Sequence, residues 1–263
     1  MLHSEFITSP NNSKIKLIRS LQARRRNRES EGAFIAEGIR LVEEAIAVGW
    51  PISFLLFDET LSARGMSLLN QLDQKQNYII SQVSPELMAS ISDTETPQGI
   101  LAVLQRQTLP LSDSPTFLLI ADQIRDPGNM GTLIRTAEAA GADAILIPPG
   151  TVDAFSPKVI RAAMGGHFHL PILSLDWSLL SEYIGDLPVF LADAEGGTPL
   201  WEVDFCQPCV LLVGGESFGA SPEGKKFATQ RVTIPMRGRA ESLNAAIAAG
   251  LLIGEVLRQR YST

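Results

Sequence analysis

Short apolar runs alternate with segments of helical spacing through the C-terminal half of this chain. The pattern predicts strands at 117–121, 144–147, 169–173, 189–192, 210–213 and 232–234. It predicts helices between them at 128–140, 157–164 and 177–184, and a last helix that begins after Ser242 and ends near Arg260. Strands that are apolar throughout and alternate with helices are typical of a mostly parallel sheet covered on both faces.

The last helix has little polar surface in its first turns. Ser242 can cap it, and its apolar positions include Leu243, Ile247 and Leu251, with alanine and glycine between them. We therefore expect this helix to be buried.

The N-terminal half has a similar alternation on a smaller scale. Strands are expected at 33–38, 52–57, 78–81 and 99–104, with helices at 39–49 and 84–91. The stretch 105–116 is polar, contains prolines and shows no periodicity, which is typical of a linker. We predict a small α/β domain at 1–106, a linker at 107–116 and a larger domain at 117–263.

Positive charge is concentrated near the N-terminus of a chain that is acidic as a whole. The net charge is 22 − 29 = −7, yet residues 14–28 contain no acidic side chain. Ile15, Ile18 and Leu21 keep helical spacing, which leaves the basic residues on the outer face and in the tail that follows. Such a block is often only a solvated surface, but here it favours contact with a polyanion. The candidate RNA-binding residues are Lys14, Lys16, Arg24, Arg25, Arg26 and Arg28.

Cysteines and histidines give no metal site in this sequence. Cys206 and Cys209 have the spacing of half a zinc motif, but no second pair accompanies them. His167 and His169 are interpreted as strand-face residues. No segment is long and apolar enough to cross a bilayer, so a cytoplasmic protein without a membrane partner is expected.

Three loops that follow predicted strands carry polar and glycine residues. They are DPGNMGTLIRTAEAAG at 126–141, LLVGGESFGAS at 211–221 and IPMRGRAESLNAAIAAG at 234–250. In a parallel sheet, ligands bind beyond the C-terminal ends of the strands, where such loops meet. The glycines after the strand at 210–213 do not form GxGxxG or a Walker motif, which argues against a nucleotide-dependent oxidoreductase.

Together, these loops resemble motifs 1, 2 and 3 of the SpoU/TrmH family, the RNA ribose 2′-O-methyltransferases of the SPOUT class. The resemblance covers 117–260, and 14–105 resembles the L30e-like RNA-binding domain that often precedes it. The resemblance implies an α/β fold with a SPOUT-type parallel sheet and a C-terminal trefoil knot. It also implies S-adenosyl-L-methionine as cofactor and a homodimer formed through the knot region.

The resemblance also assigns site residues. Those expected to contact S-adenosylmethionine are Gly214, Gly215, Ile234, Met236 and Leu243. Those expected around the transferred methyl group are Asn129, Arg135, Glu216, Ser242 and Asn244. The family mechanism uses the motif 1 arginine to help remove the hydroxyl proton. A guanidinium group is a poor base, so Arg135 could instead hold an RNA phosphate, and both roles stay open.

We therefore expect an S-adenosylmethionine-dependent 2′-O-methyltransferase that acts on structured RNA, with ribosomal RNA favoured by the L30e-like domain. The alternatives are a transfer RNA substrate and a non-catalytic RNA-binding protein of ribosome assembly. A protein that only bound RNA would not need the polar residues of the three motifs.

Overall fold

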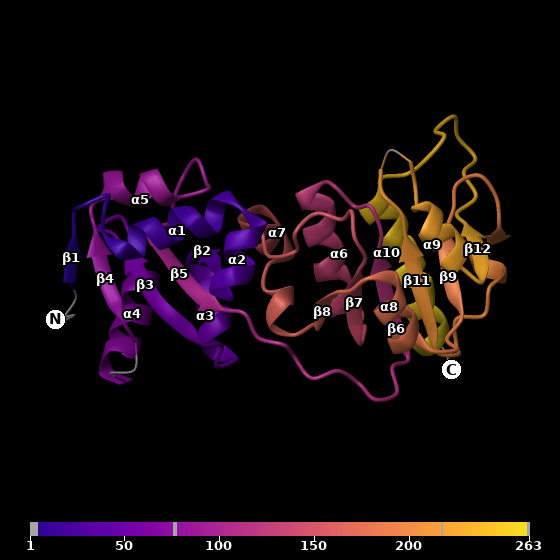
Figure 1. Cartoon of the computed structure of the whole chain (residues 1–263), viewed down its shortest axis with the longest axis horizontal. Helices are drawn as coiled ribbons and strands as arrows, with labels where there is room; N and C mark the ends of the chain where they lie inside the picture. The colour runs from indigo at the N-terminus through magenta and orange to yellow at the C-terminus, as the bar shows by residue number, and fades with distance from the viewer. Residues whose placement is uncertain (1–4, 76–77, 217, 262–263) are drawn as a thin grey trace. The chain divides into compact units, whose positions relative to one another are not determined.

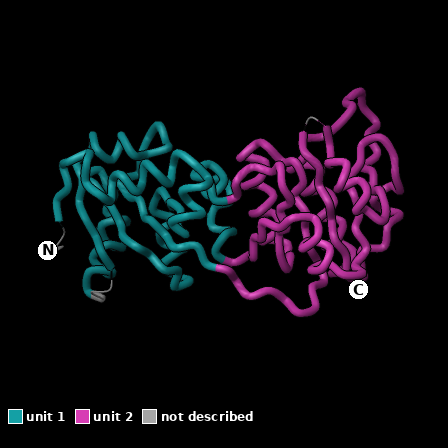
Figure 2. The backbone as a smooth tube through the Cα atoms, in the orientation of Figure 1, with its two compact units in different colours: residues 1–107, 155–168 teal, residues 108–154, 169–263 magenta. Residues whose placement is uncertain are grey.

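The chain folds into two compact units (Figure 2). The structure is a computed structural model that describes residues 5–75, 78–216 and 218–261. The first unit contains residues 1–107 and 155–168, and the second contains 108–154 and 169–263. The segment 155–168 thus packs within the first unit, although its place in the sequence suggested the larger domain. Residues 106–116 contain neither helix nor strand.

The first unit is built on a five-stranded mixed sheet with the order β1-β4-β3-β5-β2 (Figure 1). Parallel pairing joins β1 to β4 and β4 to β3, whereas β5 runs antiparallel to both β3 and β2. The strands are β1 (Glu5–Ile7), β2 (Ala33–Glu37), β3 (Ile52–Phe57), β4 (Ile80–Val83) and β5 (Ile100–Gln105).

Helices of the first unit bury their apolar faces against this sheet. Ile15, Ile18 and Leu21 of α1 join a core with strand residues such as Phe54 and Val103, as the helical spacing predicted. The helices are α1 (Ser13–Ala23), α2 (Arg25–Glu31), α3 (Ile39–Ala47), α4 (Ala63–Lys75), α5 (Pro85–Ile91) and α7 (Pro157–Ala163).

The second unit contains a seven-stranded sheet in which every pair is parallel, which confirms the predicted sheet type. The strand order is β10-β12-β9-β11-β6-β7-β8. The strands are β6 (Phe117–Ala121), β7 (Ala144–Ile147), β8 (Ile172–Ser174), β9 (Val189–Ala192), β10 (Thr198–Pro199), β11 (Cys209–Val213) and β12 (Gln230–Thr233).

Helices lie against this sheet, as the pattern predicted. Leu180 of α8 (Trp177–Ile184) shares a buried cluster with alternate strand residues such as Leu118 and Leu212, and Phe227 of α9 (Pro222–Phe227) packs against that cluster. The other helices, α6 (Pro127–Ala139) and α10 (Ala245–Tyr261), pack on each other and contact β6, β7 and β11 (Figure 1). The knot implied by the resemblance stays a prediction.

The sequence analysis missed some elements of the fold. It did not foresee β1, α2, α4, α9 or β10, and α1 and α2 are separated by the extended residue Arg24. The strand predicted at 169–173 begins only at Ile172, because Pro171 directly before it cannot donate to the ladder.

The N-terminus and the burial of α10 also differ from the prediction. Ser242 does not cap this helix; the side-chain oxygen of Asn244 accepts hydrogen bonds from the backbone N–H groups of Ala246 (2.9 Å) and Ile247 (3.2 Å). One face of α10 is buried through Ala249, Leu252, Ile253 and Val256. The positions expected to be buried are exposed: Ile247 (56%) and Leu251 (47%) lie on the opposite side of α10, and Leu243 (36%) precedes the helix.

Candidate functional site

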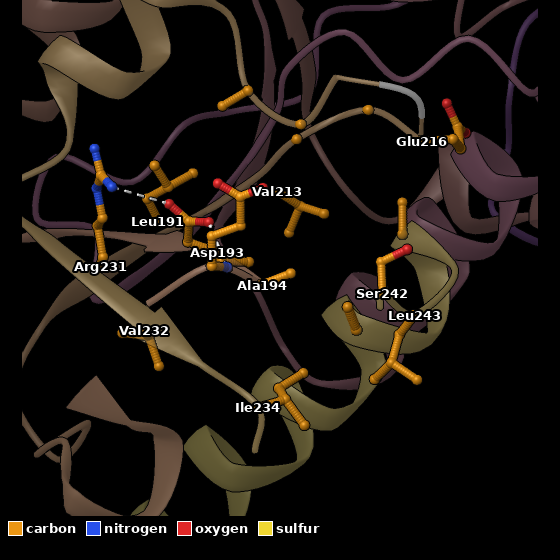
Figure 3. Close-up of a pocket in the computed structure, with 18 of the residues that line it drawn as sticks. Leu191, Asp193, Ala194, Val213, Glu216, Arg231, Val232, Ile234, Ser242 and Leu243 are labelled. Atoms are coloured by element: carbon orange, nitrogen blue, oxygen red, sulfur yellow. Dashed lines mark hydrogen bonds and ion pairs between the residues drawn. The ribbon is translucent and has the colours of Figure 1, made fainter. Parts of the chain in front are cut away.

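A cavity of about 560 Å³ opens at the C-terminal ends of β9, β11 and β12 (Figure 3). These strands are neighbours in the sheet, so the loops that follow them meet at one edge. All five residues predicted to contact the cofactor line the cavity, and so do Glu216 and Ser242 of the predicted catalytic set. Its volume is within the usual range for a small-molecule site.

Three side chains from the three motifs form a hydrogen-bonded chain beside this cavity. Asn129 lies in the first turn of α6, where Asp126 caps the helix by accepting from the Asn129 backbone N–H at 2.8 Å. The Asn129 amide nitrogen donates to Glu216 at 2.7 Å, and its amide oxygen accepts from the Asn244 amide at 2.9 Å. Because Asn244 also caps α10, these hydrogen bonds connect Glu216 to the beginning of the last helix.

Glu216 is held as a carboxylate by this arrangement. Burial by itself would raise the pKa of Glu216, but the hydrogen bond from Asn129 and those from the backbone N–H groups of Glu216, Arg125 and Asp126 together lower it. The backbone N–H of Arg125 lies 3.4 Å from the carboxylate. Glu216 therefore presents a negative charge at the cavity near neutral pH.

The glycines after β11 are required by the packing of their own loop. A Cβ on Gly214 would lie 2.2 Å from the backbone nitrogen of Ala220, and one on Gly215 would lie 2.1 Å from the carbonyl oxygen of Gln123. Both distances are shorter than any allowed contact. The loop is closed at its base, where Gly215 and Gly219 exchange backbone hydrogen bonds of 3.0 and 3.1 Å.

Asp122 and Gln123, which directly follow β6, both contact this loop. The Asp122 carboxylate accepts a hydrogen bond from the Ser221 backbone N–H at 2.7 Å. Gln123 has a left-handed backbone (φ 59°), which is uncommon for a residue other than glycine, and its carbonyl oxygen packs against Gly215. Burial raises the pKa of Asp122, and the hydrogen bonds from Ser221 only partly oppose this shift.

Arg135 and Ser242 are less constrained than the three linked side chains. Arg135 lies on the exposed side of α6, between the buried residues Ile134 and Ala137. Among the residues that the structure describes, no hydrogen-bond or ion-pair partner is found for its guanidinium group. Ser242 is exposed and lines the cavity. An exposed guanidinium group without a described protein partner is available to a negatively charged ligand.

The loop after β9 also contributes to the cavity, which the sequence analysis did not foresee. Asp193 and Glu195 line the cavity, together with Arg231 of β12. Figure 3 shows the ion pair between Arg231 and Asp193, whose charged atoms are 3.4 Å apart. An acidic residue directly after a predicted strand was the available signal, but the position of β9 between β11 and β12 could not be read from the chain.

The basic segment of the first unit is only partly available at the surface. Lys16, Arg24, Arg25 and Arg26 are exposed, although Arg25 pairs with Glu29 at 2.7 Å. Of the other two candidates, Arg28 is buried, which corrects its assignment as an RNA contact, and Lys14 is partly buried with structural partners. Lys14 donates to Glu5 (3.0 Å) and Ser81 (2.7 Å), whereas Arg28 is 5% exposed and donates to the carbonyl oxygens of Leu21 and Gln22.

The histidine interpretation is also corrected. His167 lies in a 3-10 turn, is buried, and packs edge-on against Phe155 with ring centroids 5.2 Å apart. Neither His167 nor His169 belongs to a strand. Cys206 and Cys209 are free thiols, and the described residues contain no cluster that could bind a metal ion. Within the same residues, no helix could span a membrane.

Comparison with known families gives two matches along the chain. Residues 116–254 match the SpoU rRNA Methylase family, and residues 12–102 match the MRM3-like substrate binding domain. The chain is 34% identical to the 23S rRNA (guanosine(2553)-2′-O)-methyltransferase RlmP of Bacillus subtilis (strain 168), covering 94% of this chain and 97% of that protein. It is 32% identical to the 23S rRNA (uridine(2479)-2′-O)-methyltransferase of Streptomyces viridochromogenes, covering 95% and 91%.

Solved structures agree with these matches over nearly the full length. The AdoMet-bound rRNA methyltransferase from Sinorhizobium meliloti superimposes with a TM-score of 0.85 at 30% identity, covering 97% of this chain and 98% of that one. The SpoU methyltransferase AviRb from Streptomyces viridochromogenes, in complex with AdoMet, gives 0.84 at 29% identity, covering 96% and 99%. The chain therefore belongs to the SpoU rRNA methylase family.

Proposed function

We propose that this protein transfers a methyl group from S-adenosylmethionine to the 2′-hydroxyl of a ribose in ribosomal RNA. The observation that carries the proposal is the chain of hydrogen bonds from Glu216 through Asn129 to Asn244, which joins the three family motifs beside one cavity. Relatives along the full length of the chain are named as 23S rRNA 2′-O-methyltransferases, which supports RNA of the large ribosomal subunit as the substrate.

The cavity fits S-adenosylmethionine in its charge and in its apolar surface. Four carboxylates line it (Asp193, Glu195, Glu216 and Glu241) against two basic side chains, Lys225 and Arg231. This negative balance suits a ligand with a sulfonium cation and an ammonium group. Apolar side chains suited to an adenine ring line the same cavity: Leu191, Val213, Val232, Ile234, Met236 and Leu243. When bound, the cofactor supplies an activated methyl group.

The chain's own residues must align the ribose hydroxyl and assist the loss of its proton. We assign the alignment to Asn129, Glu216 and Asn244, because their mutual hydrogen bonds fix their positions before any ligand binds. Ser242 lines the cavity beside them and is assigned a contact with the ligands. A carboxylate kept ionised by its neighbours can accept a hydrogen bond from an approaching hydroxyl group.

Arg135 is assigned to the RNA phosphate rather than to proton removal. Its side chain is exposed, has no described protein partner, and lies on the same helix as Asn129. A guanidinium group stays protonated at neutral pH and binds phosphate through two parallel hydrogen bonds. Such a grip would orient the ribose that carries the phosphate, which is consistent with an essential role in turnover.

We further propose that two copies of the chain associate through α10. The exposed side chains Ile247 and Leu251 are spaced four residues apart and form one apolar stripe on this helix. A contiguous apolar stripe on the surface is typical of an interface. Replacing Ile247 and Leu251 with glutamate should convert a dimer into a monomer, which light scattering after size exclusion can measure.

The first unit is assigned to RNA binding, through the exposed residues Lys16, Arg24, Arg25 and Arg26. The match to a substrate binding domain supports this assignment. Because the proposed substrate is ribosomal RNA, we also propose that the protein works in the cytoplasm.

The decisive experiment measures methyl transfer directly. The purified protein is incubated with S-adenosylmethionine that carries a labelled methyl group, and with ribosomal RNA or transfer RNA that lacks 2′-O-methylation. We expect label in ribosomal RNA at one ribose, detected as a bond that resists alkaline hydrolysis. Label in transfer RNA alone would favour the alternative substrate. RNA binding without any transfer of label would favour a non-catalytic assembly protein.

A further inference from the structure

Asp193 lines the cavity because of the strand order. It is the first residue after β9, and β9 lies between β11 and β12 in the sheet. Motif 2 follows β11 and motif 3 follows β12. A ligand held between those two motifs must therefore lie over the end of β9.

The carboxylate of Asp193 is held in one orientation by its surroundings. One oxygen pairs with Arg231 at 3.4 Å, and the other accepts from the backbone N–H of Glu195 at 3.1 Å. The backbone N–H of Asp193 donates to the Val232 carbonyl at 2.9 Å, which fixes the start of the loop to β12. The side chain of Asp193 keeps 18% of its surface exposed, and the residue lines the cavity (Figure 3).

We propose that Asp193 accepts hydrogen bonds from the ribose hydroxyl groups of the adenosine part of S-adenosylmethionine. The inference rests on the proposed function and assigns a binding role to a loop outside the three motifs. Arg231 acts as a positioning residue, because it contacts the carboxylate and holds it toward the cavity.

The surroundings favour a neutral diol over a cation as the partner of Asp193. Arg231 already compensates the charge of this carboxylate, so it has less attraction left for a sulfonium or ammonium group. Among the described residues, Glu195 and Glu241 line the same cavity without such a basic partner and suit a cation better. The two oxygens of a carboxylate can accept from both hydroxyl groups of a ribose.

The apolar residues around Asp193 define where the base would lie. Leu191 precedes Asp193 by two positions on β9, and Val213 and Val232 lie at the ends of the neighbouring strands. A flat purine ring can rest on these side chains. Its attached ribose then reaches the end of β9, where Asp193 is the first polar side chain.

The test measures binding rather than turnover, with 5′-methylthioadenosine and its 2′-deoxy and 3′-deoxy analogues as neutral probes. In the wild-type protein, removing a hydroxyl group that bonds to a carboxylate should weaken binding by about 10- to 100-fold in calorimetric titration. In Asp193→Ala, the same removal should change the affinity by less than about 3-fold, because the acceptor is already gone.

The matched control is Glu195→Gln, which neutralises a carboxylate two residues away on the same loop. Glu195→Gln should still bind the deoxy analogues more weakly than 5′-methylthioadenosine, by the same factor as the wild-type protein. Asp193→Asn keeps an oxygen that can accept from Glu195, so it serves if Asp193→Ala unfolds, which thermal unfolding would reveal. It should also show a smaller effect of the missing hydroxyl than the wild type.

Two results would overturn the inference. One is that removing a hydroxyl group from the probe weakens binding to the folded Asp193 variants as much as it does for the wild-type protein. The other is weaker binding of S-adenosylmethionine in Asp193→Ala with unaltered binding of S-adenosylhomocysteine, since this would mean that the carboxylate contacts the sulfonium. Failure of the proposed function itself is distinguishable, because the wild-type protein would then bind neither S-adenosylmethionine nor the neutral probe.

Discussion

Asn129 is the residue whose removal should most clearly separate catalysis from cofactor binding. It donates to Glu216 and accepts from Asn244, yet it does not line the cavity. Replacing it with alanine removes both hydrogen bonds at once. Glu216 and Asn244 then lose the group that fixes their separation, while the apolar residues of the cavity stay in place.

The magnitude follows from the two bonds. A hydrogen bond to a charged group contributes about 1.5–3 kcal/mol and a neutral one about 1 kcal/mol. Solvent reaches this network, because Glu216 and Asn244 are exposed, so about half of the sum should be realised. A loss of about 1.3–2 kcal/mol in transition-state stabilisation corresponds to a rate that is lower by about 8- to 30-fold.

The assay is single-turnover methylation of RNA at saturating RNA and S-adenosylmethionine, with cofactor affinity measured separately by calorimetry. Thr132→Ala is the matched control, because Thr132 lies on the same helix, is exposed, and bonds only to the Gly128 carbonyl of its own turn. Asn129→Asp should be slower than Asn129→Ala, since it places a second carboxylate beside Glu216. A rate for Asn129→Ala within 3-fold of wild type would refute the proposed role of the network.

Other changes test separate parts of the molecule. Arg135→Ala should lower the methylation rate by about 10²- to 10⁴-fold with unchanged cofactor affinity, and Arg135→Lys should recover little if the group binds phosphate through two bonds. Gly214→Val should abolish cofactor binding in calorimetry, because the new side chain would collide with the backbone of Ala220. Replacing the arginines at 24–26 with alanine should lower the salt slope of RNA binding by up to about 2, at about 0.7 per phosphate contact. Burial raises the pKa of Asp122 in the folded protein, so ionisation of this carboxyl group lowers the free energy of unfolding. The full loss of stability is reached only at a pH above the raised pKa. Asp122→Asn should therefore gain more stability over wild type at pH 8 than at pH 4 in urea unfolding.

The sequence predicted which residues would meet because parallel strands share one functional edge. Asn129 lies 87 residues before Glu216 and 115 residues before Asn244. Each of the three nevertheless follows a strand of the same sheet. Their polar character in otherwise apolar surroundings was visible along the chain. The family resemblance then assigned them to one site, and the hydrogen bonds bring the three of them together.

Other features depend on spatial order, which a linear pattern does not contain. The end of β9 reaches the cavity only because β9 inserts between β11 and β12, so Asp193 could not be distinguished from any acidic loop residue. The apolar stripe of α10 was read as buried because hydrophobicity indicates that a surface should be covered. It does not indicate whether the cover comes from the same chain. Arg28 was counted as a surface charge because its carbonyl partners lie in another helix, α1, across the break at Arg24.

Two residues that contact the motif 2 loop, Asp122 and Gln123, lower the stability of the folded state. Their position explains why they are tolerated. Asp122 is a buried carboxylate with one oxygen that finds no partner among the described residues, and Gln123 is a non-glycine residue in the left-handed region. Each of these features costs free energy in the folded state. Both residues contact the loop from Gly214 to Ser221, one at each end. The held ends of this loop have little freedom to lose when the proposed cofactor binds, and this offsets the cost.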